Sequence, residues 1–151
     1  MGPPPWLYVA PEVEGDGEIE KRLATSRRDQ DAIWRVKNAP ANLVDALAPE
    51  IVDGHGAVVI DRFSAWIRTQ LNMRPPSQDG ELQAEVELLA ERLYRSVVPV
   101  VLVTTEVGLG FRPAEVQDRR LLYVVGLANQ TLAARADGVV FMVSGVPLRL
   151  R

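Results

Sequence analysis

The chain has 151 residues, of which 47% are hydrophobic and 25% are charged, and its formal net charge is −3 at pH 7. That length is typical of one domain with an ordinary buried core, so we expect a single domain over residues 1–151. The acidic balance gives no electrostatic support for a nucleic-acid partner. The absence of cysteine excludes disulfides, zinc fingers and thiol catalysis, and a single histidine, His55, excludes a multi-histidine metal site within one chain.

No stretch of the sequence is typical of a targeting or membrane segment. Residues 1–15 lack the basic start and the uninterrupted apolar core of a signal peptide. The apolar run VVPVVLV (residues 97–103) contains a proline and is far too short to span a bilayer. We therefore expect a cytoplasmic protein without a membrane partner.

The first half of the chain alternates between apolar runs and amphipathic stretches. The run WLYVA (residues 6–10) predicts a short buried strand, and residues 19–28 predict a helix with Arg27 and Arg28 near its end. A short helix is predicted between the prolines of residues 39–50, and a strand over residues 57–60 that ends at Asp61. A helical stretch through Trp66 and Leu71 follows.

The second half continues this alternation. Residues 72–80 predict a loop with the turn signal Asp79–Gly80, and residues 81–97 predict an amphipathic helix. Further elements are predicted as a strand over 100–104, a helix from Pro113 to about Arg135, a buried strand over 138–145 and a terminal edge strand over 147–151. The alternation favours the α/β class, with a mainly parallel sheet and helices on both faces.

Two polar residues lie at or just after the predicted strand over residues 57–60. Asp61 stands at the strand's carboxyl end, where ligands bind in parallel sheets and where a carboxylate can reach Mg²⁺. The alternative is that Asp61 caps the helix that begins at Arg62. Ser64 either contacts a phosphate or substrate or bonds locally to the helix backbone.

The stretch TTEVGLGFRP (residues 104–113) breaks the strand over 100–104 into a glycine-rich loop. Glu106, Gly108 and Gly110 either line a nucleotide or corrinoid cleft or form a turn that reverses the chain. Among the other singular residues, Trp34 and Trp66 are predicted in the core, and His55 as a solvated loop residue.

Together these segments resemble the bifunctional adenosylcobinamide kinase/adenosylcobinamide-phosphate guanylyltransferase family of cobalamin biosynthesis. The loop TTEVGLGFRP resembles the family's Asn-Glu-Val-Gly-x-Gly motif, and GLANQTLAARAD (residues 126–137) resembles its Gly-x-x-Asn-Gln helix. The segment VVIDRFSAWI (residues 58–67) is similar to its Asp-x-Leu-Thr-x-Trp motif, and LYVAPE (residues 7–12) is similar to its Tyr-Ile-Ala-Thr motif. The resemblance runs from about Leu7 to residue 151.

The resemblance implies a nucleotide-kinase-like, P-loop-type fold, a homotrimer, and the use of GTP or ATP with Mg²⁺. This family phosphorylates adenosylcobinamide, a corrinoid, and then transfers GMP from GTP through a guanylyl-histidine. Carried onto matching positions, the resemblance makes Asp61 a candidate metal ligand. The implied nucleotide or substrate contacts are Ala10, Asp61, Ser64, Thr105, Glu106 and Gly108.

The sequence departs from the family at residues that would hold the triphosphate and the guanylyl group. The family begins with a strand and a glycine-rich phosphate loop that ends in Lys-Ser, and this chain starts after them. Ser26 stands where the guanylylated histidine is expected, and a serine hydroxyl without a nearby base is a poor nucleophile. Thr105 and Pro11 replace the asparagine and threonine of their motifs. We therefore expect no catalytic residue of the family in this chain.

Three interpretations stay open on the sequence. The first is a degenerate family member without kinase or guanylyl-transfer activity alone, which retains weak nucleotide or corrinoid binding. The second is an active enzyme completed by a missing N-terminal segment or a partner chain, and the third is a structural interaction module. Because the absent first strand is central in related folds, a closed sheet favours the first interpretation and an open slot favours the second.

Overall fold

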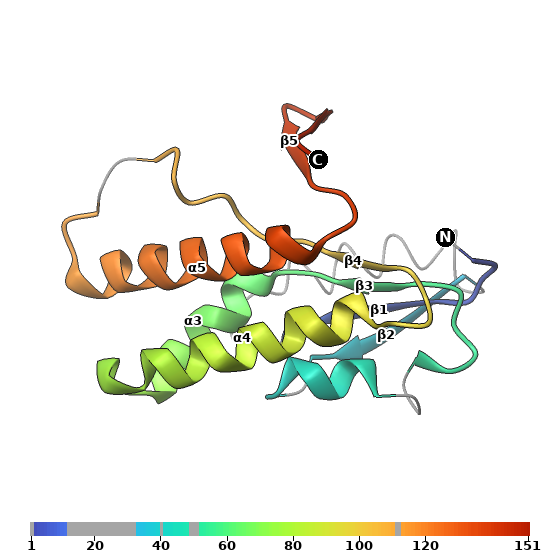
Figure 1. The fold of residues 1–151 in the computed structure, drawn as a ribbon, viewed down its shortest axis with the longest axis horizontal. Coiled ribbons are helices and arrows are strands. Elements are labelled where there is room, and N and C mark those ends of the chain that lie inside the picture. The colour runs from blue at the N-terminus through green and yellow to red at the C-terminus, as the bar shows by residue number, and fades with distance from the viewer. Residues whose placement is uncertain (1, 12–32, 40, 49–51, 111–112) are drawn as a thin grey trace.

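A parallel four-stranded sheet forms the centre of the fold (Figure 1). The computed structural model describes residues 2–11, 33–39, 41–48, 52–110 and 113–151. Its strands are β1 (Trp6–Ala10), β2 (Trp34–Asn38), β3 (Val58–Ile60) and β4 (Val100–Leu102). Their order is β2-β1-β3-β4 and all neighbouring pairs are parallel, so the predicted α/β class with a mainly parallel sheet is confirmed.

The register of the sheet separates its two faces. Leu7 pairs with Val58, which pairs with Val100, and the next row on the same face joins Val9, Ile60 and Leu102. These β-branched and leucine side chains suit a pleated surface, and those of β1 and β3 are at most 1% exposed. β3 pairs directly with β4, so the sheet of the described strands is closed.

The helices pack against the buried face of the sheet and share its hydrophobic core. In Figure 1, α4 and α5 run side by side, and α3 follows directly after β3. The helical elements are η1 (Leu43–Leu47), α3 (Phe63–Met73), η2 (Pro76–Gln78), α4 (Asp79–Tyr94) and α5 (Val116–Arg135). No helix in the described ranges is long and apolar enough to cross a membrane.

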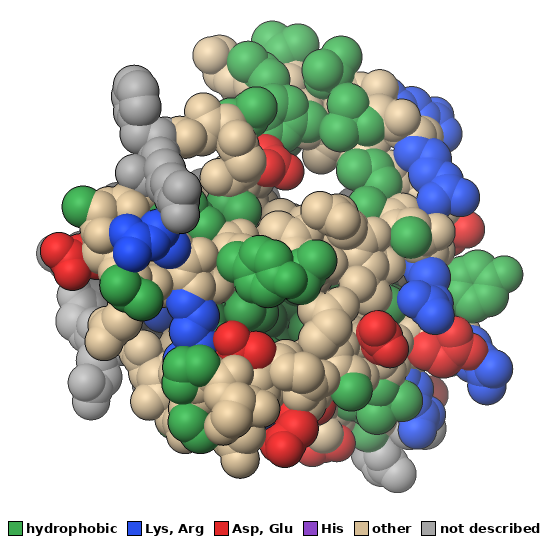
Figure 2. Space-filling view, turned by 60° about the vertical axis from the view of Figure 1, so that its left-hand side comes forward, with side chains coloured by type: hydrophobic (Ala, Val, Ile, Leu, Met, Phe, Trp, Pro, Cys, Tyr) green, Lys and Arg blue, Asp and Glu red, His purple; other side chains and the backbone are tan. Residues whose placement is uncertain are grey.

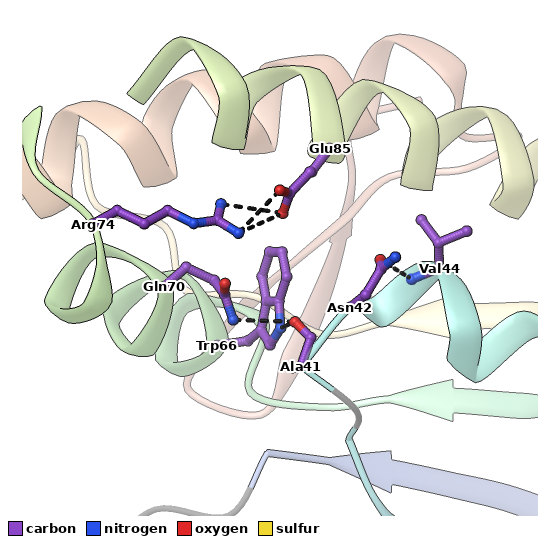
Figure 3. Close-up of polar contacts among 7 residues, drawn as sticks. All are labelled: Ala41, Asn42, Val44, Trp66, Gln70, Arg74 and Glu85. Atoms are coloured by element: carbon purple, nitrogen blue, oxygen red, sulfur yellow. Dashed lines mark hydrogen bonds and ion pairs between the residues drawn. The ribbon is translucent and has the colours of Figure 1, made fainter. Parts of the chain in front are cut away.

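A polar cluster ties α3 to its neighbours (Figure 3). The carbonyl oxygen of Ala41 accepts hydrogen bonds from the indole N–H of Trp66 and the amide of Gln70, each at 3.1 Å. Trp66 is 3% exposed, which confirms its predicted place in the core, and Gln70 is the buried polar side chain beside it. At the end of α3, Arg74 donates to both carboxylate oxygens of Glu85 on α4, at 2.9–3.1 Å.

Arg120 of α5 joins the same region from the other side. Its guanidinium donates to Asp79 at the start of α4, at 2.6 Å for the shortest contact, and to the carbonyl oxygens of Leu71 and Arg74. The predicted turn at Asp79–Gly80 was wrong, because both residues form the first turn of α4. A carboxylate is stabilising at a helix N-terminus, and here it also pairs with Arg120.

The C-terminal residues form a separate antiparallel hairpin of β5 (Val140–Val143) and β6 (Val146–Arg149). Ser144 and Gly145 both have positive φ, the conformation that a two-residue hairpin turn requires. The predicted strand over residues 138–145 is present as β5, but the prediction that it is buried was wrong. In the part of the chain that the structure describes, β5 does not join the main sheet, and its apolar side chains are largely exposed.

Further differences between the sequence-based predictions and the structure lie in the region before β3. β2 was not predicted, because charged residues interrupt the run WRVKN at the edge of the sheet. Trp34 lies on this edge strand and is half-buried, with its ring 5.2 Å from that of Trp6, so its predicted place in the core was wrong. The predicted helix over residues 19–28 lies outside the described residues.

We expect the substitution Arg120→Met to destabilise the protein by about 2 kcal/mol or more. It leaves Asp79 and two carbonyl groups without their shared donor in a region where Arg120 is 19% exposed. Urea unfolding followed by circular dichroism measures this change. The matched control is Arg68→Met, whose exposed partner Asp118 lies 3.7 Å away and whose loss should cost less than about 0.5 kcal/mol. Equal losses of unfolding free energy in the two variants would contradict the larger contribution that we assign to Arg120.

Candidate functional site

The carboxyl ends of β1, β3 and β4 meet at one edge of the sheet. The backbone N–H of Asp61 donates to the Val9 carbonyl at 2.8 Å, and that of Val103 donates to the Ile60 carbonyl at 2.8 Å. Ala10 and Asp61 therefore end neighbouring strands, and the loop after β4 begins beside them. Ligands of parallel α/β sheets bind beyond this edge.

Two donors hold the Asp61 carboxylate. The Tyr8 hydroxyl donates to Oδ2, and the backbone N–H of Arg62 donates to Oδ1 at 2.7 Å. The alternative role as a helix cap was wrong: Arg62 occupies the cap position of α3, with φ 59° and ψ 38°, and no side chain caps the helix. Asp61 as a metal ligand stays a prediction.

Tyr8 is the site residue that the sequence did not single out. Burial raises the pKa of its hydroxyl, and the hydrogen bond to Asp61 and the charge of that carboxylate raise it further, whereas Arg62 lowers it. Tyr8 pairs with Val59 in the register, and side chains two residues apart share a face, so Tyr8 and Asp61 lie on the same face. This contact depends on the pairing of two distant strands, which no local pattern reveals.

The side chain of Ser64, near the start of α3, contacts the side chain of Thr105, in the loop after β4. Their hydroxyl oxygens lie 3.0 Å apart, so the expected local bond of Ser64 to the helix backbone was wrong. Asn129 of α5 holds the same loop, because it accepts from the Thr104 hydroxyl at 2.8 Å and donates to the Thr105 carbonyl at 3.0 Å. The loop is thus tied to two helices.

Glu106 and Gly108 contact each other. The Gly108 N–H donates to the Glu106 carboxylate at 2.5 Å, and a Cβ atom at Gly108 would lie 2.8 Å from that oxygen. The contact is local, and the exposed Glu106 side chain could move away from an added Cβ atom, so this geometry alone does not require a glycine. Both residues are exposed, and a role for them as the wall of a cleft stays a prediction.

The site offers one carboxylate for a cation. No group of three or more histidine, cysteine, aspartate or glutamate side chains that could hold a metal occurs in the parts of the chain that the structure describes. Each oxygen of Asp61 accepts one of the two bonds above and keeps a second lone pair. Mg²⁺ often binds through one or two carboxylates together with waters and substrate phosphates, so this donor set fits Mg²⁺ carried by a nucleotide.

His55 lies at the opposite edge of the sheet. It precedes β3, and its neighbour Gly56 donates to the carbonyl of Pro5, just before β1. The prediction of a solvated loop histidine was wrong in one respect: the ring is half-buried, and its Nδ1 is buried without a hydrogen-bond partner among the described residues.

Comparison with known proteins gives a match along nearly the whole chain. The family model described as cobinamide kinase / cobinamide phosphate guanyltransferase matches residues 2–150. The bifunctional adenosylcobalamin biosynthesis protein CobP of Pseudomonas aeruginosa is 33% identical over 145 residues, which cover 95% of this chain and 81% of that protein. The corresponding CobU proteins of Salmonella typhimurium and Escherichia coli are each 27% identical, over 98% and 96% of this chain and 87% and 85% of those proteins.

The raised pKa of Tyr8 predicts how stability depends on pH. The folded chain keeps the Tyr8 proton to higher pH than the unfolded chain, in which tyrosine ionises near pH 10. The contribution of protonated Tyr8 is therefore complete below about pH 10 and is lost as the pH rises further. We expect the free energy of unfolding to fall more steeply above about pH 10 in the wild type than in Tyr8→Phe, as measured by urea unfolding from pH 8 to 11.5. The control Tyr123→Phe, at a residue 66% exposed, should keep the wild-type slope; identical slopes in all three proteins would contradict the prediction.

Proposed function

Because the chain belongs to the cobinamide kinase / cobinamide phosphate guanyltransferase family, we propose that its 151 residues bind a nucleotide or corrinoid weakly and alone catalyse neither kinase nor guanylyl transfer. The nucleotide is GTP or ATP with Mg²⁺, at the carboxyl edge of the sheet beside Asp61. The observation that carries this proposal is the separation of this edge from the single histidine of the sequence.

The position of His55 argues against the guanylyl step. Ser26 stands where the family motif has the guanylylated histidine, so His55 is the remaining candidate for the imidazole nucleophile. β3 lies between His55 and Asp61 and has three residues, which extend over about 10 Å at roughly 3.3 Å per residue. Attack on a phosphoryl group requires atoms about 3–3.5 Å apart, so His55 is too far from a phosphate group held beside Asp61 through Mg²⁺.

The lysines argue against the kinase step in the same way. A phosphate loop uses a lysine that follows a glycine-rich turn, and the sequence has only Lys21 and Lys37, neither of which follows such a turn. Lys37 lies on the edge strand β2 and is exposed. What the described residues offer a nucleotide is the Asp61 carboxylate and the hydroxyls of Ser64 and Thr105.

The alternative is an active enzyme that a further segment or a partner chain completes. An inserted strand would need a gap between strands, and the four described strands pair without one. The closed sheet therefore supports the first proposal over this alternative.

We also propose that the chain associates with copies of itself, as the homotrimer of the family implies. In Figure 2, hydrophobic side chains gather at the top of the molecule, where the hairpin lies in Figure 1. By the hairpin register, one of its faces consists of Phe141, Val143, Val146 and Leu148, of which the last three are 48–65% exposed. A two-stranded hairpin is marginally stable in water unless something covers it, which supports a subunit contact here.

Calorimetry and a labelling assay test the proposed function. We expect Mg²⁺-GTP or Mg²⁺-ATP, or adenosylcobinamide phosphate, to bind with Kd of roughly 10–100 µM, about −7 to −5.5 kcal/mol. Radiolabelled GTP should leave no acid-labile GMP on the protein, and no phosphate should pass to adenosylcobinamide. Turnover by the purified chain would contradict the proposal, as would a GMP adduct that His55→Ala abolishes. If none of these ligands binds, the third interpretation, a structural interaction module, is favoured.

Light scattering tests the self-association. We expect the wild type to have a mass above the 16.7 kDa of one chain at about 50 µM, and Leu148→Glu to lower it towards that value, because a buried carboxylate opposes the contact. The matched control is Met142→Glu, at a residue 57% exposed on the other face of the hairpin, which should retain the assembly. A monomeric wild type would contradict the proposal.

A further inference from the structure

We propose that Tyr8 is a positioning residue: its hydroxyl fixes the orientation of the Asp61 carboxylate towards a Mg²⁺-bound phosphate group. This inference rests on the proposed nucleotide binding and assigns a role within that site. It differs from a packing role for Tyr8, because it depends on the hydroxyl group and not on the ring.

The backbone and the ring of Tyr8 are both held in place. β1 is an inner strand, so it pairs on one side with β2 and on the other with β3. The Tyr8 ring meets the ring of Trp34 edge-on, with centroids 6.4 Å apart and planes at 86°. Trp34 also contacts Trp6, so an aromatic row braces the phenol along this face. Because the Tyr8 hydroxyl is held in place, its hydrogen bond can fix the orientation of the Asp61 carboxylate.

The two bonds to Asp61 together determine the plane of its carboxylate. The Tyr8 hydroxyl donates to Oδ2 from the neighbouring strand. The backbone N–H of Arg62, the residue that follows Asp61, donates to Oδ1. A single bond would leave the carboxylate free to rotate about its terminal torsion, which is broad for aspartate. With one donor on each oxygen, one orientation is favoured, and one lone pair of each oxygen stays available to a cation or its waters.

The backbone after β3 also keeps this arrangement in place. Arg62 has a left-handed backbone, which is uncommon outside glycine and clusters at functional sites. This conformation makes the abrupt change from β3 to α3 that places Asp61 at the edge of the sheet and Ser64 near Thr105.

The experiment compares Tyr8→Phe with the matched control Tyr123→Phe, which removes the same group from an exposed residue of α5. Two probes are used: Mn²⁺ alone, followed by its electron paramagnetic resonance signal, and GTP by calorimetry with Mg²⁺ or with a chelator. Loss of a group that orients a metal ligand typically weakens metal binding by about tenfold or more. We expect about a tenfold weaker affinity of Tyr8→Phe for Mn²⁺ and Mg²⁺-GTP, and less than about a twofold change for GTP without metal.

A double-mutant cycle with Asp61→Asn shows whether Tyr8 acts through Asp61. In the Asp61→Asn background, Tyr8→Phe should change the affinity for Mg²⁺-GTP by less than about twofold. The inference is overturned if Tyr8→Phe behaves like Tyr123→Phe, if its effect is equal with and without metal, or if the effect persists with Asn at position 61. Thermal unfolding confirms that each variant is folded.

The same data separate the failure of this inference from that of the proposed function. A wild type that binds Mn²⁺ but no nucleotide would refute the nucleotide binding of the proposed function, and the Mn²⁺ affinities would still decide the role of Tyr8. A wild type that binds Mg²⁺-GTP with the same affinity as Tyr8→Phe would refute the inference alone. Binding of neither Mn²⁺ nor Mg²⁺-GTP to the folded wild type would refute both the inference and the proposed binding of Mg²⁺-GTP.

Discussion

The parallel register of β1, β3 and β4 is the constraint on which the rest of the structure depends. It aligns Val9 with Ile60 and Leu102, so that one face of the sheet meets the helices. Because side chains alternate between faces, the same register places Tyr8 and Asp61 together on the opposite face. A slip of one residue would expose the core row and separate Tyr8 from Asp61 in the same step. Core packing and the geometry of the site are therefore not independent features of this fold.

The helices that pack on the sheet also position the loops of the site. α3 begins two residues after Asp61, and its first residue, Phe63, is fully buried, so the packing of α3 determines where Ser64 lies. Arg120 fixes α5 against the end of α3 and the start of α4. Further along α5, Asn129 holds the loop after β4. One helix thus contributes a charged contact to α3 and α4 and an amide contact to the loop after β4.

The sequence predicted those elements whose signal is local. Short apolar runs identified β1, β3 and β4, and the spacing of apolar residues identified α3, α4 and α5. β2 was missed because an edge strand needs no continuous apolar run, and the hairpin was mispredicted as buried because an apolar run does not say what covers it. In the site, strand ends alone pointed to Asp61 and to the loop with Thr105. The Tyr8–Asp61 contact spans 53 residues and requires the strand order, which the sequence pattern does not contain.

The direction of the strands also bears on which chemistry the chain supports. A parallel sheet has two unlike edges: the carboxyl edge carries Asp61 and the hydroxyls, and the amino edge carries His55. A short strand keeps them apart by its own length, and no side-chain rotation closes a distance of about 10 Å. An imidazole that reacts with a nucleotide bound beside Asp61 would therefore have to lie near the carboxyl edge, and His55 does not. The proposed binding at the carboxyl edge therefore does not depend on the single histidine of the sequence.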